Sequence, residues 1–283
     1  MAMPQEDMPT MRSRRLGGEL RQLRTAAGLT VQEAADALEC GHPKISQIET
    51  GRRGIRQIDL TLLLNLYGVE DDQYRVNLKR LAKEIHKVDW WSNAGPLFHD
   101  SLKDYLTLES DSQLVRSYEN QVLPGLLQTE AYMRQVIAAT NADRVDPLVN
   151  ARLKRQEHLE NQAGFMLRAI IDVPALHRIP GTREEVGEQI EHLLRQSKLP
   201  NVNIQVLPLD AALPINQWPP FTIFSLRGEP PADVVWLEHI TGGTMLEQRQ
   251  DVPHYTKTWD ELTAAALSPA ASKRYLRDLI KEA

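Results

Sequence analysis

A stretch from His42 to Gln47 places side chains that can form hydrogen bonds at the start of one predicted helix. His42, Ser46 and Gln47 fall on or near the outer face of that helix, whereas Ile45 and Ile48 fall on its inward face. An imidazole, a hydroxyl and an amide can donate to and accept from the edges of nucleic-acid bases. The chemistry that these residue types indicate is recognition through hydrogen bonds.

Two short helices position these side chains. Thr30 is a predicted N-cap, and Glu33 three residues later completes a capping box. The helix that follows breaks at residues 39–41, and Pro43 fits only the first turn of the next helix, because its missing N–H removes no hydrogen bond there. Gly51 ends this second helix. Two helices joined by a tight turn form a helix-turn-helix, whose second helix lies in the major groove of DNA.

The stretch also resembles a known family. Residues 16–67 are similar to helix-turn-helix domains of the lambda-repressor or XRE class, and the match needs no gap. The residues at the motif positions are Leu29, Thr30, Ala34, Ala35, Ile45, Ser46, Ile48, Glu49 and Gly51.

This resemblance implies roles for individual residues. The base-reading positions of the motif fall on His42, Pro43, Ser46 and Gln47. Gln47 could pair with adenine, His42 could donate to guanine N7, and Pro43 could only make apolar contact, for example with a thymine methyl. Phosphate contacts, which position a protein without reading sequence, are expected from Arg21, Thr30, Gln32, Lys44, Arg52 and Arg53. The family usually has glutamine directly after the cap, where this chain has Val31, so Gln32 is expected to substitute for it in part.

The same resemblance implies a structural ion pair between Arg24 in the first helix and Glu49 at the end of the third. Removing one partner of a half-buried pair costs more than the pair contributes, because the other charge stays behind. We therefore expect Glu49 to matter for stability. Arg24 is expected to be structural, with a phosphate contact as the alternative.

The length and composition indicate a globular protein. The 283 residues are enough for two ordinary domains, and 42% are apolar and 25% charged. The sequence contains no long uncharged apolar run, so we expect no transmembrane helix. Residues 1–11 are expected to be a disordered leader rather than a signal peptide. The one cysteine, Cys40, cannot form an intrachain disulfide, which favours the cytoplasm. Cys40 is expected to act as a small hydrophobe, with a redox switch as the alternative.

The net charge of −5 is distributed unevenly along the chain. Residues 12–56 carry nine basic and five acidic side chains, so that this segment has a charge of +4 and the remainder a charge of −9. A small basic segment attached to an acidic body is typical of a DNA reader whose remaining part does not bind DNA.

We expect an all-α helix-turn-helix domain of about five helices, followed by a mixed α+β C-terminal domain. The expected bounds are a leader at 1–11, the DNA-binding domain at 12–70, a connecting helix and hinge at 71–96, and the C-terminal domain at 97–283. Helices of the N-terminal part are expected at 16–27, 58–67 and 71–90, the last as a connector or a dimer-forming arm. Strands are expected at 112–121, 165–173, 202–207, 221–226 and 233–237, and Gly242-Gly243 is expected to be a turn.

Several phrases of the C-terminal part resemble the WhiJ-like regulators of actinobacteria. They are Pro124–Thr129, Arg152–Gln156, the strand ending in Leu176, Asn201–Pro208, Phe221–Ile223 and Val235–Glu238. This resemblance implies an antitoxin-like domain without a well-established activity, because members tend to be encoded beside a small partner protein. Where many relatives have Glu-Ala-Ala-Leu, this chain has Asp-Val-Pro-Ala-Leu at 172–176, so a role carried by that glutamate is in doubt here.

Other kinds of chemistry find little support in the sequence. The eight histidines show no metal-ligand spacing, and no nucleophile elbow, P-loop or GxGxxG occurs, so we expect no metal, no cofactor and no enzymatic activity. Glu238-His239 is expected to be a surface pair, with a catalytic or ligand role as the alternative. The five tryptophans are expected in the core and hinge, or around a small-molecule pocket of the C-terminal domain.

The leading hypothesis is a sequence-specific transcriptional regulator that binds palindromic double-stranded DNA as a homodimer. Its C-terminal domain would bind a small protein partner encoded nearby or sense a signal, and no membrane is involved. The alternative is an antitoxin-like protein whose main role is to sequester that partner, with autoregulatory DNA binding. An enzyme with an appended DNA-binding domain is the third hypothesis.

Overall fold

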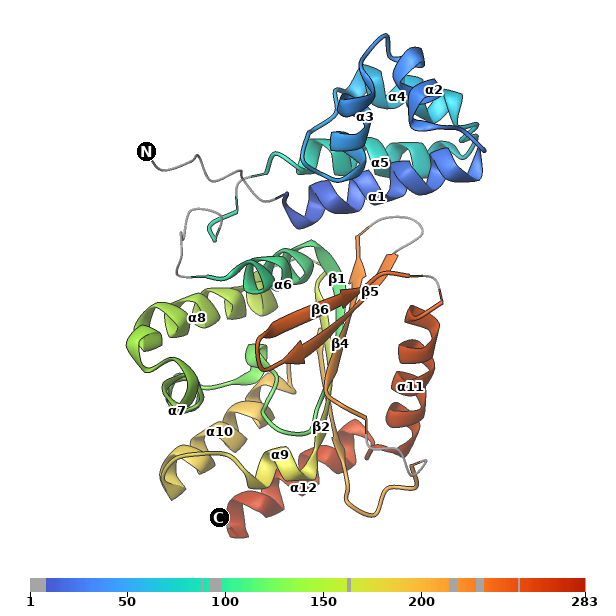
Figure 1. Cartoon of the computed structure of the whole chain (residues 1–283). Helices are drawn as coiled ribbons and strands as arrows, with labels where there is room; N and C mark the ends of the chain where they lie inside the picture. The colour runs from blue at the N-terminus through green and yellow to red at the C-terminus, as the bar shows by residue number, and fades with distance from the viewer. Residues whose placement is uncertain are drawn as a thin grey trace. The chain divides into compact units, whose positions relative to one another are not determined.

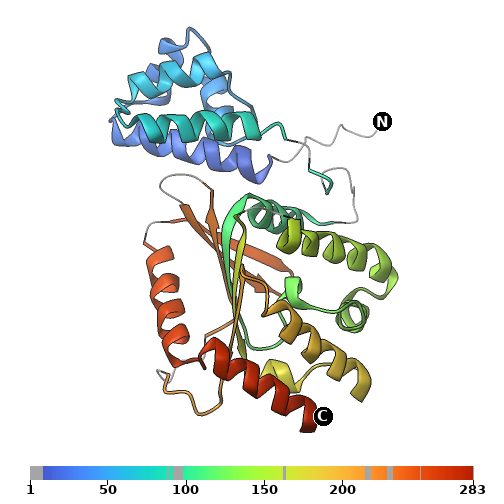
Figure 2. The same ribbon diagram turned by 180° about the vertical axis from the view of Figure 1, so that it is seen from behind.

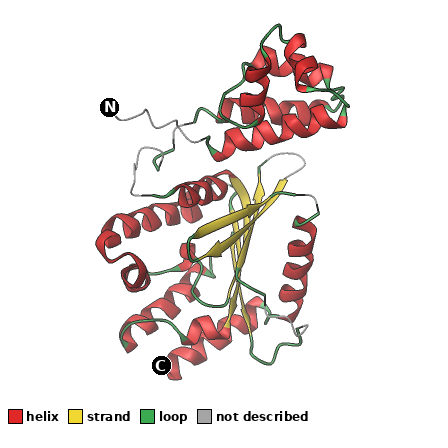
Figure 3. Ribbon diagram, in the orientation of Figure 1, coloured by secondary structure: helices red, strands yellow, loops and turns green. Residues whose placement is uncertain are grey.

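The computed structural model describes residues 9–87, 89–91, 98–161, 164–213, 218–227, 232–248 and 250–282. The described residues up to 91 form one compact unit and those from 98 onward form a second (Figure 1). The first unit is built from helices, whereas the second combines helices with a sheet (Figure 3). This confirms the predicted fold class. In the described part of the chain, no helix has the length and apolar character needed to span a bilayer.

The described residues of the N-terminal unit form five α-helices. They are α1 (Met11–Ala26), α2 (Val31–Ala37), α3 (His42–Glu49), α4 (Gln57–Leu66) and α5 (Asp72–Glu84). Their buried faces form one core in which Leu20, Ile45 and Leu63 are almost fully enclosed. This core fixes the orientation of α3 relative to its neighbours.

The first helix begins earlier than the sequence predicted. It starts at Met11 rather than at residue 16, because the Thr10 hydroxyl accepts a hydrogen bond from the Ser13 amide and caps it. Met11 is buried, so it does not belong to a disordered leader. Residues 1–8 of the predicted leader lie outside the described residues.

The fifth helix is shorter than predicted and packs inside the unit. The predicted helix at 71–90 ends at Glu84. Leu78, Leu81 and Ala82 are buried in the core, and α5 packs against α1 and α4. The apolar spacing that suggested a connector or a dimer-forming arm is therefore satisfied within the same unit.

Helices α1 and α3 approach each other closely at Gly17. A Cβ atom built on Gly17 would lie closer than 3.0 Å to the carbonyl oxygens of Ile48 and Glu49. Glycine is the residue that permits this approach, because any side chain would meet backbone atoms that cannot rotate away. The neighbouring Gly18 has open space around its Cβ position.

These two glycines provide a matched test of the helix contact. Gly17→Ala is expected to destabilise the protein by roughly 1–3 kcal/mol, because the added carbon overpacks the α1–α3 contact. Gly18→Ala is expected to stabilise it by up to about 1 kcal/mol, because alanine is the better helix former. Denaturant unfolding of both variants measures the difference, and equal effects would contradict the close contact.

The C-terminal unit is built on a six-stranded mixed sheet of order β3-β2-β1-β4-β5-β6. Strands β1, β2 and β3 are parallel, and β4, β5 and β6 are antiparallel. The bounds are β1 (Ser112–Glu119), β2 (Met166–Asp172), β3 (Val202–Leu207), β4 (Phe221–Leu226), β5 (Ala232–His239) and β6 (Gly242–Leu246). Since parallel neighbours need a crossover, helices lie between β1 and β2 and between β2 and β3.

Strand β6 was missed from the sequence. Gly242-Gly243, predicted to be a turn, begin a strand in which Gly243 pairs with Glu238. A Cβ atom on Gly243 would lie closer than 3.0 Å to the ring of Trp236. The glycine is therefore present because a buried tryptophan lies across the strand, a contact that local sequence does not reveal.

Helices cover the sheet unequally. Helices α6 (Asp100–Asp111), α7 (Glu130–Asn141), α8 (Val145–Asn161) and α10 (Arg183–Gln196) lie on one side, and α11 (Val252–Ala265) lies on the other (Figures 1 and 2). Helix α12 (Pro269–Glu282) packs along the edge strand β3. The short elements are the 3₁₀ turns η2 (Gly125–Leu127) and η3 (Ala142–Arg144) and the helix α9 (Val173–His177).

Candidate nucleic-acid interface

Helix α3 separates a buried face from an exposed one. Ile45 and Ile48 are 1% and 2% exposed and pack into the core of the N-terminal unit. His42, Pro43, Ser46 and Gln47, the predicted base readers, are all exposed. The helix begins at a Gly41 N-cap with Pro43 in its first turn. The outer face of α3 is therefore a short polar surface, and the opposite face is held in place by its packing into the core.

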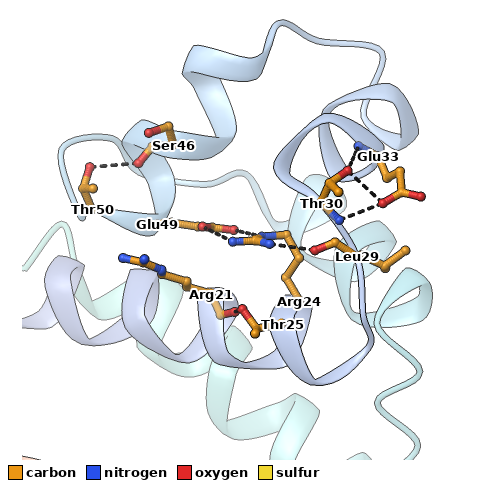
Figure 4. Close-up of polar contacts among 9 residues, drawn as sticks. All are labelled: Arg21, Arg24, Thr25, Leu29, Thr30, Glu33, Ser46, Glu49 and Thr50. Atoms are coloured by element: carbon orange, nitrogen blue, oxygen red, sulfur yellow. Dashed lines mark hydrogen bonds and ion pairs between the residues drawn. The ribbon is translucent and has the colours of Figure 1, made fainter.

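An ion pair joins the end of α3 to α1. Arg24 Nε donates to Glu49 Oε1 at 2.6 Å and Arg24 Nη2 donates to Glu49 Oε2 at 3.0 Å (Figure 4). A third donor, Nη1, reaches the Leu29 carbonyl at 2.7 Å, directly before α2. The hydrogen bonds that Arg24 donates to Glu49 raise the pKa of Arg24. One guanidinium on α1 thus contacts both the last residue of α3 and the residue that precedes the N-cap of α2.

The capping box of α2 is complete. The Glu33 carboxylate accepts from the Thr30 amide at 2.7 Å and from the Thr30 hydroxyl at 2.8 Å (Figure 4). The hydroxyl in turn accepts from the Glu33 amide at 3.2 Å. These hydrogen bonds, with the backbone one largest, lower the pKa of Glu33. Because the single hydroxyl proton of Thr30 is already donated, a phosphate contact would require the proton to change acceptor.

Lys44 lies in a different environment from the one its predicted phosphate role would need. Its ammonium is 2.8 Å from Asp59 Oδ2, and Arg56 also donates to Asp59, from Nε at 3.2 Å and Nη2 at 2.9 Å. Burial acts to raise the pKa of Asp59, but the hydrogen bonds from Arg56 and Lys44 outweigh it and the pKa is lowered. Lys44 is therefore held by a buried carboxylate on α4.

The predicted phosphate contacts fall into two groups. Thr30, Lys44 and Gln32, whose amide donates to Asp36 at 2.7 Å, are hydrogen-bonded within the unit. Arg21, Arg52 and Arg53 are exposed and form no ion pair with any residue that the structure describes. The second group offers cationic side chains that need no rearrangement to meet phosphate.

Arg56 and Asp59 were not recognised as part of this region from the sequence. Asp59 stands in a run, 58–64, whose other residues are apolar except for Thr61, and a carboxylate in such a helix needs a cationic partner when it is buried. That signal was present, but the identity of the partner was not, because Lys44 is 15 residues away in the chain.

The two ion pairs of α3 should differ in their effect on stability. Glu49→Ala leaves the Arg24 guanidinium half-buried without its carboxylate, and we expect a loss of roughly 1–3 kcal/mol. Lys44→Ala is expected to cost less, because Arg56 continues to compensate Asp59. Thermal or urea unfolding of both variants compares them, and a larger loss for Lys44→Ala would contradict this order.

Two families match the chain. Residues 15–76 match the family described as Helix-turn-helix domain, and residues 102–278 match the family described as Domain of unknown function (DUF5753). No significant match is found among curated proteins or among solved structures. The first match supports the predicted helix-turn-helix regulator, whereas the resemblance to WhiJ-like regulators stays a prediction.

Proposed function

This chain belongs to the DUF5753 family and carries a helix-turn-helix domain, and from that premise we propose that it is a sequence-specific transcriptional regulator that binds palindromic DNA as a dimer. The helix-turn-helix domain makes it a DNA-binding regulator. The observation that carries the finer proposal is the exposed polar face of α3, fixed from behind by the Arg24–Glu49 pair.

Base reading is assigned to His42, Pro43, Ser46 and Gln47 on that face. Gln47 has the most versatile side chain of the four, since its amide both donates and accepts. Arg21, Arg52 and Arg53 supply the phosphate contacts. Lys44 contributes by orienting the start of α3 through Asp59.

Base and phosphate contacts are distinguished by how affinity responds to sequence and to salt. On an operator selected from random DNA, Gln47→Ala is expected to reduce discrimination at one base position by about 1–3 kcal/mol. Arg53→Ala is expected to weaken binding to all sequences and to reduce the slope of log K against log salt by about 1. Fluorescence anisotropy titrations at several salt concentrations measure both effects.

The matched control is Arg183→Ala, which removes an exposed arginine from α10 of the C-terminal unit. This variant should bind the operator as the parent protein does. A salt slope that falls equally in Arg183→Ala and Arg53→Ala would show that the effect is one of net charge. If Gln47→Ala keeps the sequence specificity of the parent protein, Gln47 does not contact a base.

An apolar stripe on α4 supports dimer formation through the N-terminal unit. Ile58, Leu62 and Leu66 are 65%, 46% and 37% exposed and recur every four residues, which places them on one face of the helix. A second copy fits this stripe, because a two-fold interface presents the same patch twice and an apolar stripe is complementary to itself. Three side chains are few beside the roughly 800 Å² per partner of a stable interface, so DNA must contribute to the pairing.

Disruption of the stripe should uncouple the two half-sites. Leu62→Glu is expected to abolish cooperative binding to the palindrome while leaving affinity for a single half-site unchanged. Leu209→Glu, which charges a still more exposed leucine of the C-terminal unit, is the control. Gel-shift titrations on full and half operators measure cooperativity, and cooperative binding by Leu62→Glu would place the interface elsewhere.

We assign partner binding or signal sensing to the C-terminal domain. The alternative role, sequestering a small partner protein, rests on the resemblance of its phrases to WhiJ-like regulators. A pull-down from native extract with the full chain, followed by footprinting with and without the recovered protein, separates the two. A partner that binds without changing the footprint favours sequestration.

A further inference from the structure

A pocket of about 500 Å³ lies between α11 and the segment that leads into β4, on the side of the sheet that α11 covers (Figures 1 and 2). This volume falls within the range of roughly 300–1,000 Å³ that small-molecule sites occupy. The α11 pocket is defined here by six of the residues that line it, which are Trp218, Phe221, His254, Tyr255, Lys257 and Glu261. All six belong to the C-terminal unit, so a ligand bound there would contact that unit.

Aromatic rings form part of the wall of the α11 pocket. Phe221 is buried, and its ring centroid lies 5.7 Å from that of Tyr118 and 5.3 Å from that of Tyr255. These contacts hold the Tyr255 ring against the buried core of the unit. Tyr255 and Trp218 pack against that core but are only partly buried themselves. The pocket therefore offers aromatic surface that the chain does not fully cover.

The Trp218 side chain has the fewest partners among these rings. Its backbone carbonyl accepts a hydrogen bond from the Asn120 amide at 3.1 Å, which fixes the chain beside the pocket. The indole itself forms no ring contact and no hydrogen bond with any residue that the structure describes. The same holds for the hydroxyl of Tyr255 within the described ranges. A ligand in the pocket can therefore supply an acceptor for an indole N–H and for a phenol.

Helix α11 contributes the polar part of the wall. His254, Lys257 and Glu261 are spaced by three and four residues, which places them on one face of the helix. Lys257 lies 3.8 Å from Glu261, and the two side chains are 79% and 38% exposed. An exposed ion pair of this length contributes little to stability. The ammonium of Lys257 can therefore turn toward an anionic ligand at little cost.

The groups at the pocket favour an anion over a cation. The indole, the phenol, the ammonium and the imidazole can all donate hydrogen bonds, whereas the carboxylate of Glu261 already faces Lys257. Aromatic walls can also bind a quaternary ammonium group, but here Lys257 would repel it. A planar ring that carries a carboxylate satisfies both the aromatic surface and the donors.

We propose that the α11 pocket binds a small aromatic carboxylate, whose ring packs against Trp218 and Tyr255 and whose carboxylate is bound by Lys257. This inference rests on the sensing role proposed for the C-terminal domain and deepens it. Ligand binding is measured without DNA, and operator binding is measured separately on the same preparation. Failure of one proposal is therefore distinguishable from failure of the other.

The experiment uses the purified full chain and matched probes. The acids are indoleacetate, phenylacetate and naphthoate. Each is compared with its neutral amide, with cyclohexylacetate, which lacks the aromatic ring, and with tryptamine, which carries a cation instead. At least one acid is expected to raise the melting temperature more than these three kinds of comparison compound, because a ligand that binds the folded state stabilises it. Isothermal titration then gives its affinity.

The same chemistry could come from a free acid or from the C-terminus of a protein that ends in an aromatic residue. The peptide Gly-Gly-Trp distinguishes these sources. Tighter binding of the peptide than of indoleacetate would assign the carboxylate to a protein C-terminus, and tighter binding of the free acid would assign it to a small molecule. Both outcomes support the site.

Variants separate a binding role from a structural one. Lys257→Gln is expected to weaken binding of the acid roughly three- to tenfold and to leave binding of its amide and the melting temperature of the free protein unchanged. Trp218→Leu is expected to weaken acid and amide alike, roughly tenfold, because the stacking surface is lost. Lys281→Gln is the matched control, because Lys281 on α12 is 75% exposed and is also paired with a carboxylate, that of Asp278. This control should bind the acid as the parent protein does.

Several results would overturn the proposal. They are the absence of a shift with every aromatic acid, an equal shift with an acid and its amide, and a larger shift with tryptamine than with indoleacetate. Full affinity for the acid in Lys257→Gln, or an equal loss in Lys281→Gln, would show that Lys257 does not bind the carboxylate. Full affinity in Trp218→Leu would place the ring outside the α11 pocket.

Discussion

The position of α3 depends on a backbone contact that leaves no room for a side chain larger than a hydrogen atom. At Gly17, α1 comes so close to the carbonyl end of α3 that a Cβ atom would collide with the Ile48 and Glu49 oxygens. The Arg24–Glu49 pair can form where it does because the helices are this close. These two contacts, together with the burial of Ile45 and Ile48, fix the orientation of the exposed face of α3. Recognition by a short helix requires this stiffness, because a mobile helix would lose orientational entropy on every base contact.

The basic side chains of the N-terminal unit are not all equally available to DNA. A local excess of cations suggests that all of them face DNA, but Arg24 and Lys44 are each held by a carboxylate within the unit. Their charge still contributes to the long-range field that attracts DNA. We propose that the exposed arginines neutralise phosphates directly, so the salt dependence of affinity should be smaller than the count of cations suggests.

The sequence predicted those features that depend on residues near one another in the chain. The capping box at Thr30 and Glu33, the proline in the first turn of α3 and the strands rich in β-branched and aromatic residues are local signals, and the structure contains them. Contacts between distant residues were missed. The sequence does not show that Lys44 meets Asp59, that α5 buries its apolar face on α1, or that Trp236 requires a glycine opposite it. The ion pair between Arg155 on α8 and Glu109 on α6 is of the same kind, because its two residues are 46 positions apart in the chain.

Both units contain a bidentate Arg–Glu pair that joins two helices which are not consecutive in the chain. A second basic side chain lies near each pair, and the two differ in their hydrogen-bond partners. Beside Arg24–Glu49, Lys44 has its own buried carboxylate in Asp59. Beside Arg155–Glu109, Arg152 donates to the neutral oxygen of Gln128 and forms no ion pair with any residue that the structure describes. If burial of arginine on α8 served packing alone, a neutral side chain would do so without the cost of a poorly compensated charge.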